Sequence, residues 1–251
     1  MAAVKPMPAF GRVLGRLFLL QASWNYERMQ GVGFAHAAEP AIRALCGDAD
    51  GERYRETLAR HAQFFNSHPY FAGLAVGASL RAEQDGESPE RIARLREALC
   101  SPLGSLGDRL FWAGWLPTCA ALGLVAYAFG SRGWAVALFL LLYNVVHLAC
   151  RAWTLRAGWR EGMMVASALG HPVIRAATRL AGPIAALCVG AALPVALAWQ
   201  HRGAPDAAAA AAAGGAVVFA LAARLARGHL GTVALAALIL GATWVVGLLW
   251  S

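Results

Sequence analysis

The chain has 251 residues, of which 59% are hydrophobic and only 14% are charged. Soluble domains carry about 25% charged residues, so this composition argues against a soluble enzyme and favours a membrane protein. The net charge of +8 would suit a nucleic-acid-binding protein, but Lys5 is the only lysine and the arginines lie at the ends of apolar segments, as the cytoplasmic anchors of membrane helices do. We therefore expect no nucleic-acid partner.

The charges divide the chain into two regions. Twelve of the 14 acidic residues precede residue 110, and only Glu161 and Asp206 follow it. We interpret residues 1–109 as an N-terminal helical region that carries the polar motifs on interfacial, re-entrant and charged-arm helices. Residues 110–251 are predicted to form a transmembrane helical region.

Residues 10–18 place their apolar side chains at helical spacing, with Arg12 and Arg16 outside that stripe. The pattern predicts an amphipathic helix that lies on the membrane or on a partner, although an ordinary helix facing a protein core fits it equally. Farther along, residues 53–65 predict a helix of mixed charge, which His68-Pro69 then ends.

The segment after this break, residues 69–80, is apolar but only 12 residues long. Because a full crossing needs about 20 residues, this segment predicts a re-entrant or buried helix. Residues 81–98 are strongly charged and predict a solvated helical arm.

Five later segments each approach the ~20 apolar residues that a crossing needs: 110–130, 133–150, 183–199, 207–223 and 231–250. The segment 151–182, which we interpret as a loop, holds five arginines and one glutamate, and that excess of positive charge predicts a cytoplasmic position. The sequence thus predicts an all-α membrane protein, in which an amphipathic and re-entrant N-terminal region precedes about five transmembrane helices.

Motifs for metal binding and catalysis are missing from the sequence. The five cysteines form no C-x-x-C pair and the seven histidines form no H-E-x-x-H motif. We therefore predict no metal site and no cofactor. Serine, histidine and aspartate residues are too scattered to make a nucleophile, base and acid, so we predict no catalytic residues.

Residues 21–30 hold four polar side chains with Trp24 and Tyr26 between them: Gln21, Asn25, Glu27 and Gln30. On a helix, the first two and the last two would each share a face. Amides and a carboxylate can pair sugar hydroxyls, while aromatic rings cover the apolar face of a sugar. The alternative is structural: these groups cap helices or satisfy backbone at a helix break, and Glu27 pairs with Arg28.

Two further places have polar side chains that could face a ligand. Asn66 and His68 lie at a break between a charged helix and an apolar one, and transporters often build polar sites on such breaks. Alternatively, Asn66 caps a helix and His68 is a core histidine, as we expect for His61.

Asp108 ends a glycine-rich stretch that lacks the Lys-Ser/Thr of a nucleotide-binding loop. A carboxylate at the mouth of the first span is costly unless it is paired, for which Arg109 is available, or functional.

Four segments resemble the enzyme IID component of the mannose-family (mannose/fructose/sorbose) sugar phosphotransferase systems. They are QASWNYERMQGVGF (21–34), RHAQFFNSHPYFAGL (60–74), SPLGSLGDRLFW (101–112) and NVVHLACRAWTLRAGWREG (144–162). The first three resemble the family's Trp-Asn-(Phe/Tyr)-Glu-Arg-Met-Gln, Arg-His-x-x-Phe-Phe-Asn-(Thr/Ser)-x-Pro and Gly-Pro-Leu-(Ala/Ser)-Gly-x-Gly-Asp-x-x-Phe-Trp segments, in the same order. Arg109 departs from the pattern, where a small residue or proline is usual, and the alanine-rich residues after 170 resemble the family only in hydropathy.

The resemblance implies a non-catalytic transport subunit in the bacterial inner membrane, crossing it several times. With the membrane subunit IIC it would form the channel for a hexose, in a hetero-oligomer that in the family is a trimer of IIC–IID pairs. The cytoplasmic subunits IIA and IIB would carry the phosphoryl group, which a phosphohistidine on IIB passes to the sugar. Together with the residue patterns above, we predict that Asn25, Glu27, Gln30, Asn66, His68 and Asp108 bind the substrate, and the resemblance strengthens this prediction for Glu27.

Two other functions remain open from the sequence. A IID-like chain could act as a non-transporting membrane scaffold or sensor that docks phosphocarrier proteins. A membrane enzyme acting alone is less consistent with the sequence, because it has no catalytic set.

Overall fold

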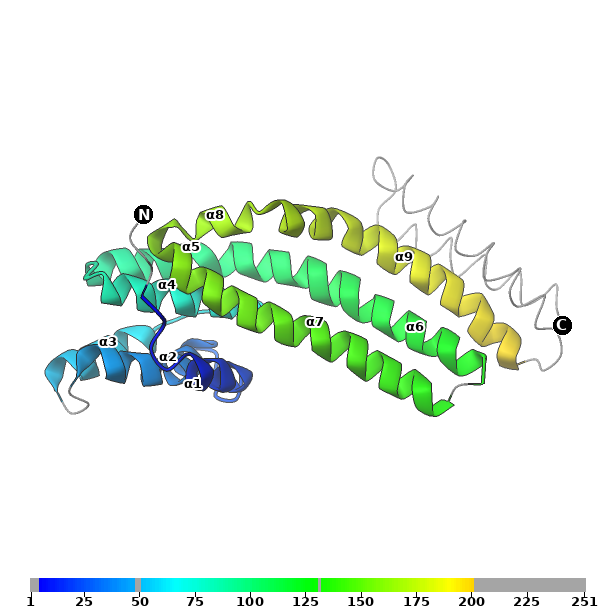
Figure 1. Ribbon diagram of the computed structural model, residues 1–251, viewed down its shortest axis with the longest axis horizontal. Helices are drawn as coiled ribbons and strands as arrows, with labels where there is room; N and C mark the ends of the chain where they lie inside the picture. The colour runs from blue at the N-terminus through cyan, green and yellow to red at the C-terminus, as the bar shows by residue number, and fades with distance from the viewer. Residues whose placement is uncertain (1–4, 48–50, 131, 201–251) are drawn as a thin grey trace. The chain divides into compact units, whose positions relative to one another are not determined.

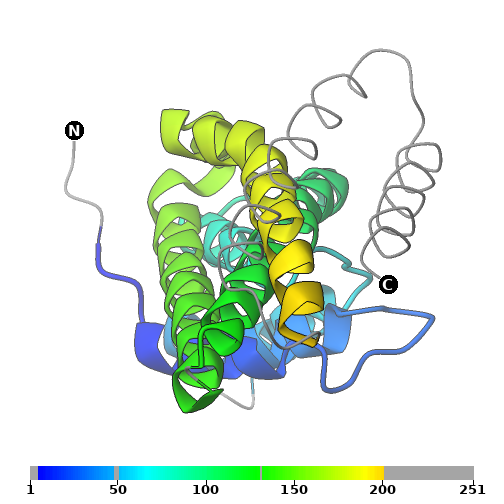
Figure 2. The same ribbon diagram turned by 90° about the vertical axis from the view of Figure 1, so that its right-hand side faces the viewer.

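The computed structural model describes residues 5–47, 51–130 and 132–200, and these residues form helices joined by short loops. Within them no β-strand forms, and the only strand-like pairings are isolated bridges. The order of the helices along the chain can be followed by colour in Figure 1 and Figure 2. The predicted all-α fold is therefore confirmed.

The first helices are short and the later ones long. They are α1 (Phe10–Arg16), the 3-10 turn η1 (Leu17–Leu19), α2 (Gly31–Cys46), α3 (Glu52–His61), α4 (Ala72–Gln84), α5 (Pro89–Gly107), the π-helical segment η2 (Asp108–Trp115), α6 (Leu116–Ala128), α7 (Arg132–Glu161), the 3-10 turn η3 (Gly162–Met164), α8 (Ala166–Leu169) and α9 (Pro172–Gln200).

Three helical stretches in the described part of the chain are long and apolar enough to cross a membrane: Pro89–Ala128, Arg132–Met164 and Pro172–Ala192. The predicted spans 110–130 and 133–150 coincide with the first two, and the predicted span 183–199 lies in α9. The remaining predicted spans, 207–223 and 231–250, lie outside the described residues. The chain is thus a membrane protein with at least three helices of spanning length.

The prediction that residues 151–182 form a loop is wrong. Helix α7 continues to Glu161, α8 follows, and α9 begins at Pro172. Proline is favoured in the first turn of a helix because its missing N–H has no partner to lose there. An excess of arginine predicts the side of the membrane and not a loop, because arginine is a good helix former and does not interrupt α7.

The chain divides into two compact units. Unit one comprises Met1–Arg109 and Asn144–Thr178, and unit two comprises Leu110–Tyr143 and Arg179–Ser251. Unit one has a closed core with Phe34, Leu74 and Leu155 fully buried. In unit two, large apolar side chains such as Trp134 and Leu141 are exposed, at 78% and 62%. Exposed apolar surface of this kind needs lipid or protein to cover it.

Helix α4 is buried almost throughout, which agrees with the buried alternative of the sequence prediction. It crosses the last part of α7 at backbone contact. A Cβ atom added at Gly77 would overlap the carbonyl oxygen of Leu155, and one added at Gly158 would overlap that of Leu74. Only glycine allows two helices to approach so closely at these positions.

The prediction of a solvated charged arm at 81–98 is wrong in part. Helix α4 ends at Gln84, a turn follows with Gly86 at φ 75°, and α5 begins at Pro89 behind its N-cap Ser88. Two charges of this segment lie inside unit one instead of in solvent: Glu83, whose side chain is 12% exposed, and Arg96, at 3%. They are buried because each has polar partners on α3, as described below.

Candidate functional site

The two polar sequence blocks nearest the N-terminus pair with each other. We call residues 25–31 and 62–67 the paired loops. Met29 and Phe65 form a parallel bridge, in which Gln30 N donates to Phe65 O (2.8 Å) and Phe65 N donates to Arg28 O (3.3 Å). The loops touch so closely that a Cβ atom at Gly31 would overlap the carbonyl oxygen of Gln63.

Gln30 closes this pairing with its side chain. Its Nε2 donates to Ser67 O at 2.7 Å, and its Oε1 accepts from Ser67 N at 3.2 Å. The side chain is 2% exposed. Both ends of the amide are therefore used within the protein, which holds Ser67 and the residues beside it in a fixed place.

The prediction that residues 21–30 share helical faces is wrong. This segment is a turn, because the Oδ1 of Asn25 accepts from the backbone N–H groups of Glu27 (3.1 Å) and Arg28 (2.8 Å). Such side-chain to backbone bonds compete with helix formation. Met29 then adopts a left-handed φ of 52°, which turns the chain toward its bridge with Phe65.

Three of the predicted site residues have exposed side chains. Glu27 has a side chain that is 82% exposed, with Arg28 as an ion-pair partner at 3.8 Å. Asn66 and Asp108 are also exposed, and among the described residues no ion pair joins Asp108 to Arg109. Beside Glu27, the rings of Trp24 and Tyr26 pack edge to face at 5.0 Å and remain exposed.

His68 belongs to a buried segment, residues 67–71, which we call the junction. Its Nδ1 accepts from Tyr70 N at 3.3 Å, and its side chain is 2% exposed. The ring lies on Gly107, where an added Cβ atom would overlap it. The glycine-rich third block thus meets the second block here, and Gly107 leaves room for the imidazole.

The fourth block meets the junction at Tyr70. The ring of His147 stacks on the Tyr70 ring at 4.8 Å, and the guanidinium of Arg151 lies 4.9 Å from its centre. Thr154 Oγ1 lies within hydrogen-bond distance of the Tyr70 carbonyl oxygen (3.2 Å). All four sequence blocks therefore converge on the junction, although they are spread over residues 21–162.

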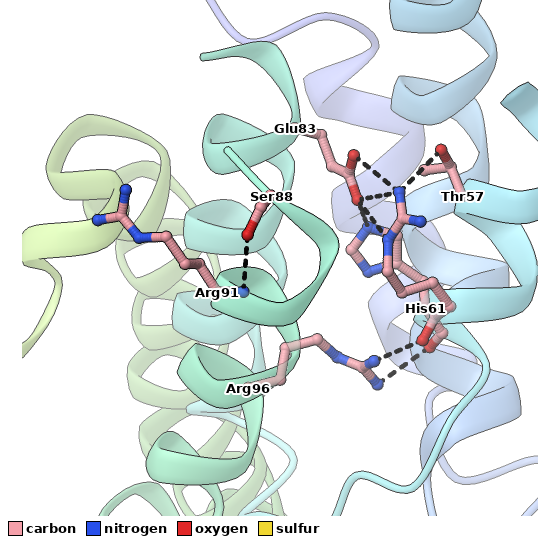
Figure 3. Close-up of polar contacts among 7 residues, drawn as sticks. Thr57, His61, Glu83, Ser88, Arg91 and Arg96 are labelled. Atoms are coloured by element: carbon pink, nitrogen blue, oxygen red, sulfur yellow. Dashed lines mark hydrogen bonds and ion pairs between the residues drawn. The ribbon is translucent and has the colours of Figure 1, made fainter. Parts of the chain in front are cut away.

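A cluster of charged and polar side chains lies at the end of α3, where the second paired loop begins. Its members are Arg60, His61 and Glu83. The carboxylate of Glu83 pairs with Arg60 and lies beside His61, and Figure 3 shows Glu83 next to His61. Arg60 Nη2 donates to its two oxygens at 3.1 and 3.2 Å, and His61 Nε2 lies 3.1 Å from Oε1. Burial lowers the pKa of His61, so the neutral ring donates to Glu83. His61 is structural, as predicted.

Arg96 reaches from α5 to the same helix end. Its Nη1 donates to Arg60 O (2.6 Å), and its Nη2 donates to His61 O and Gln63 O, both at 3.1 Å. The last carbonyl groups of a helix have no partner within the helix and carry partial negative charge. Arg96 donates to them and so holds the chain where it leaves α3. Figure 3 shows the guanidinium of Arg96 reaching the backbone beside His61.

We expect Arg96→Leu to lower the free energy of unfolding of the protein by about 3 kcal/mol or more. Three carbonyl groups would lose a charged donor, and each such hydrogen bond is worth about 1.5–3 kcal/mol. Thermal melting in detergent measures the effect. Arg94→Leu, an exposed position on the same helix, is the control and is expected to change stability by less than about 0.5 kcal/mol. Equal melting temperatures for the two variants would contradict this role for Arg96.

The pKa of His68 is lowered from 6.5 to about 4, first by burial and second by the positive charge of Arg151. His68 is therefore neutral near pH 7. Its Nδ1 accepts a hydrogen bond, so its proton is on Nε2.

This shift makes the protein sensitive to acid. The unfolded chain takes up a proton on His68 near pH 6.5, whereas the folded chain does so only near pH 4. The free energy of unfolding is therefore highest above pH 6.5 and falls as the pH drops toward 4. At pH 5 it is lower than at neutral pH by on the order of 2 kcal/mol. His68→Asn keeps an acceptor for Tyr70 N but cannot titrate, so its melting temperature should fall less between pH 7 and pH 5. An equal fall in both proteins would contradict the assignment.

Sequence reasoning missed three residues that hold this site together: Glu83, Arg96 and Arg151. The first two were interpreted as part of a solvated arm, and their partners are distant in sequence. For Arg151 a signal was present, because it is a single charge within the apolar run HLACRAWTL. An isolated charge in such a run is expected to be paired or functional.

In the described residues, no group of histidine, cysteine, aspartate or glutamate side chains could hold a metal ion. The site instead combines a rigid buried junction with an exposed surface of amide, carboxylate and aromatic side chains. Such a surface can accept and donate hydrogen bonds to a polyhydroxylated ligand.

Comparison with known sequences gives consistent matches. The sequence profile of the PTS system mannose/fructose/sorbose family IID component matches residues 9–199. The mannose-specific EIID component of Escherichia coli (strain K12) is 31% identical over 192 residues, which are 74% of this chain and 66% of that protein. The fructose permease IID component of Bacillus subtilis (strain 168) is 31% identical over 179 residues, 69% of this chain and 64% of that protein. The chain thus spans just under two thirds of the length of these relatives.

Two solved structures resemble the chain. One is a cryo-EM structure of the mannose transporter ManYZ in complex with microcin E492 (MceA), with a TM-score of 0.59 and 30% identity, covering 75% of this chain and 70% of that one. The other is a structure described as a membrane protein, with a TM-score of 0.67 and 30% identity over 74% of this chain and 70% of that one.

Proposed function

The chain belongs to the mannose/fructose/sorbose family of phosphotransferase-system IID components, and from that premise we propose that it is the IID subunit of a sugar transporter. In this proposal it forms the translocation channel with a IIC subunit, and a hexose is phosphorylated as it is imported. The division at residue 110 remains a prediction: residues 1–109 hold three of the four family-like blocks, the fourth lies at 144–162, and the first helical stretch of spanning length already begins at Pro89. The resemblance to a chain of the ManYZ mannose transporter supports a second membrane subunit as partner.

The observation that carries the proposal is the convergence of the four family-like blocks on one buried junction. Gln30 bonds to Ser67, Gly107 packs on His68, and His147 stacks on Tyr70. A chain that had kept only the hydropathy of the family would not need these interlocking contacts. Their presence supports a retained family function over a drifted one.

We assign the six candidate residues to two roles. Glu27, Asn66 and Asp108 are exposed and are proposed to contact the sugar. The side chains of Asn25, Gln30 and His68 form hydrogen bonds with backbone groups. They are proposed to hold the contacting residues in place.

The subunit itself is proposed to be non-catalytic. Phosphoryl transfer then falls to a phosphohistidine on a cytoplasmic IIB subunit, which receives the group from IIA. The match to the family's IID component supports this division. We further propose a multi-pass position in the bacterial inner membrane and a hetero-oligomer built from IIC–IID pairs, such as a trimer of pairs.

The test is sugar uptake in cells that lack their own mannose-type permease. This chain is co-expressed with its IIC, IIA and IIB, and a parallel strain omits this chain alone. We expect accumulation of sugar phosphate that disappears on omission. Lack of accumulation over a panel of hexoses, despite a stable complex with IIC, would overturn the transport function and favour the scaffold function.

A further inference from the structure

Arg151 is a buried arginine in a helix of membrane-spanning length. It lies on α7 and is 7% exposed. A charge in this position is costly unless other groups stabilise it. Its partners therefore indicate what the protein gains from keeping an arginine here.

The partners of Arg151 come from two segments that are far apart in sequence. Its Nη1 donates to Leu17 O at 2.6 Å. Its guanidinium lies over the Phe18 ring at 4.8 Å and over the Tyr70 ring at 4.9 Å. One planar group thus binds the end of the N-terminal helix and the junction at the same time.

Both of these contacts lead directly to the paired loops. Leu17 and Phe18 precede the turn that carries Glu27. In the same segment, Leu20 packs against Gly33 so closely that a Cβ atom at Gly33 would overlap the carbonyl oxygen of Leu20. Tyr70 lies four residues after Asn66 and is bonded through its N–H to His68. The exposed polar side chains of both loops are therefore anchored, through short stretches of chain, to Arg151.

We propose that Arg151 is a positioning residue, which holds the two paired loops in a fixed position relative to α7. This inference rests on the proposed transport function where it concerns sugar binding. Arginine suits the role because its flat guanidinium donates in a fixed direction while it stacks on aromatic rings. A lysine keeps the charge but cannot donate to Leu17 and cover two rings in the same way.

The first measurement is the kinetics of sugar uptake by Arg151→Lys in the full complex. We expect KM for the sugar to rise about tenfold, while the maximal rate per folded complex stays within about twofold, because the binding side chains are displaced and phosphoryl transfer is not. A purely structural role would instead reduce the amount of complex and leave KM unchanged. Arg160→Lys, an exposed position on the same helix, is the control and should leave both parameters unchanged.

The second measurement does not depend on transport. Trypsin cleavage after Arg28, in the first paired loop, is compared with cleavage after Arg55, which is exposed on α3. We expect Arg151→Lys to accelerate cleavage at Arg28 by about fivefold or more without changing cleavage at Arg55. Phe18→Leu, which removes one ring contact and leaves the buried charge in place, should change cleavage at Arg28 in the same direction by a smaller factor.

These outcomes separate the two proposals. An unchanged KM or an unchanged cleavage rate at Arg28 would overturn the role of Arg151. If the wild-type complex accumulates no sugar phosphate, the transport function fails, and the cleavage rates alone decide whether Arg151 holds the loops.

Discussion

Sugar uptake by the Glu27→Gln variant is expected to be about 10- to 100-fold less efficient than uptake by the wild type. The substitution keeps the size of the side chain but removes its charge. A hydrogen bond between a carboxylate and a sugar hydroxyl is worth about 1.5–3 kcal/mol, more than its neutral counterpart. The backbone around Glu27 is fixed by the Oδ1 of Asn25, so the loss acts on the ligand and not on the loop.

The alternative for Glu27 is an ion pair with Arg28. That pair is 3.8 Å long and exposed on both sides, and such pairs contribute little to stability. Membrane insertion and pairing with IIC should therefore be unaffected by the substitution. Glu56→Gln, which removes an exposed carboxylate from α3, is the matched control. Wild-type uptake by the Glu27 variant would show that this carboxylate does not contact the sugar.

Gly158→Ala is expected to prevent unit one from folding stably. The added methyl group would overlap the carbonyl oxygen of Leu74 and would lie 2.9 Å from Ala78 N. Both are backbone atoms of α4, so no side-chain rotation can relieve the contact, and the helices must separate. Overpacking a core commonly lowers the free energy of unfolding by about 1–3 kcal/mol. Because two backbones must separate here, we expect a loss at or above the upper end of that range.

Thermal melting in detergent, together with the yield of monodisperse protein, measures this effect. Gly104→Ala is the matched control, because no atom lies within 4 Å of the position that its Cβ would occupy. In a helix this exchange is expected to leave stability unchanged or to raise it by up to about 1 kcal/mol. Similar melting of the two variants would mean that α4 and α7 do not cross at Gly158.

Local patterns in the sequence predicted much of the fold. The apolar segments beginning at residues 110 and 133 predicted helices of spanning length, which the structure contains. The short apolar segment at 69–80 predicted a re-entrant or buried helix, because it is too short for a full crossing, and the structure shows the buried one. These predictions succeeded because they depend on residues close together in the chain.

For the candidate site, the sequence predicted which kinds of residue take part but not which residues contact one another. Nothing local shows that Gln30 bonds to Ser67 or that Arg96 satisfies the carbonyl groups at the end of α3. Those contacts join residues more than 30 positions apart, and periodicity carries no information about them. The turn at Asn25 was missed for another reason, since a side chain that bonds to its own backbone overrides the helical spacing around it.

The interlocking of the four blocks has a consequence for exchanging parts between relatives. A chimera that received residues 21–34 from another protein would still have to fit its glycine against the native Gln63 carbonyl and its amide against the native Ser67. A graft of one block would thus fit only if it kept a glycine and a glutamine at these positions. Because the four blocks contact one another, exchanging all four stretches together is what keeps every one of these contacts within one parent.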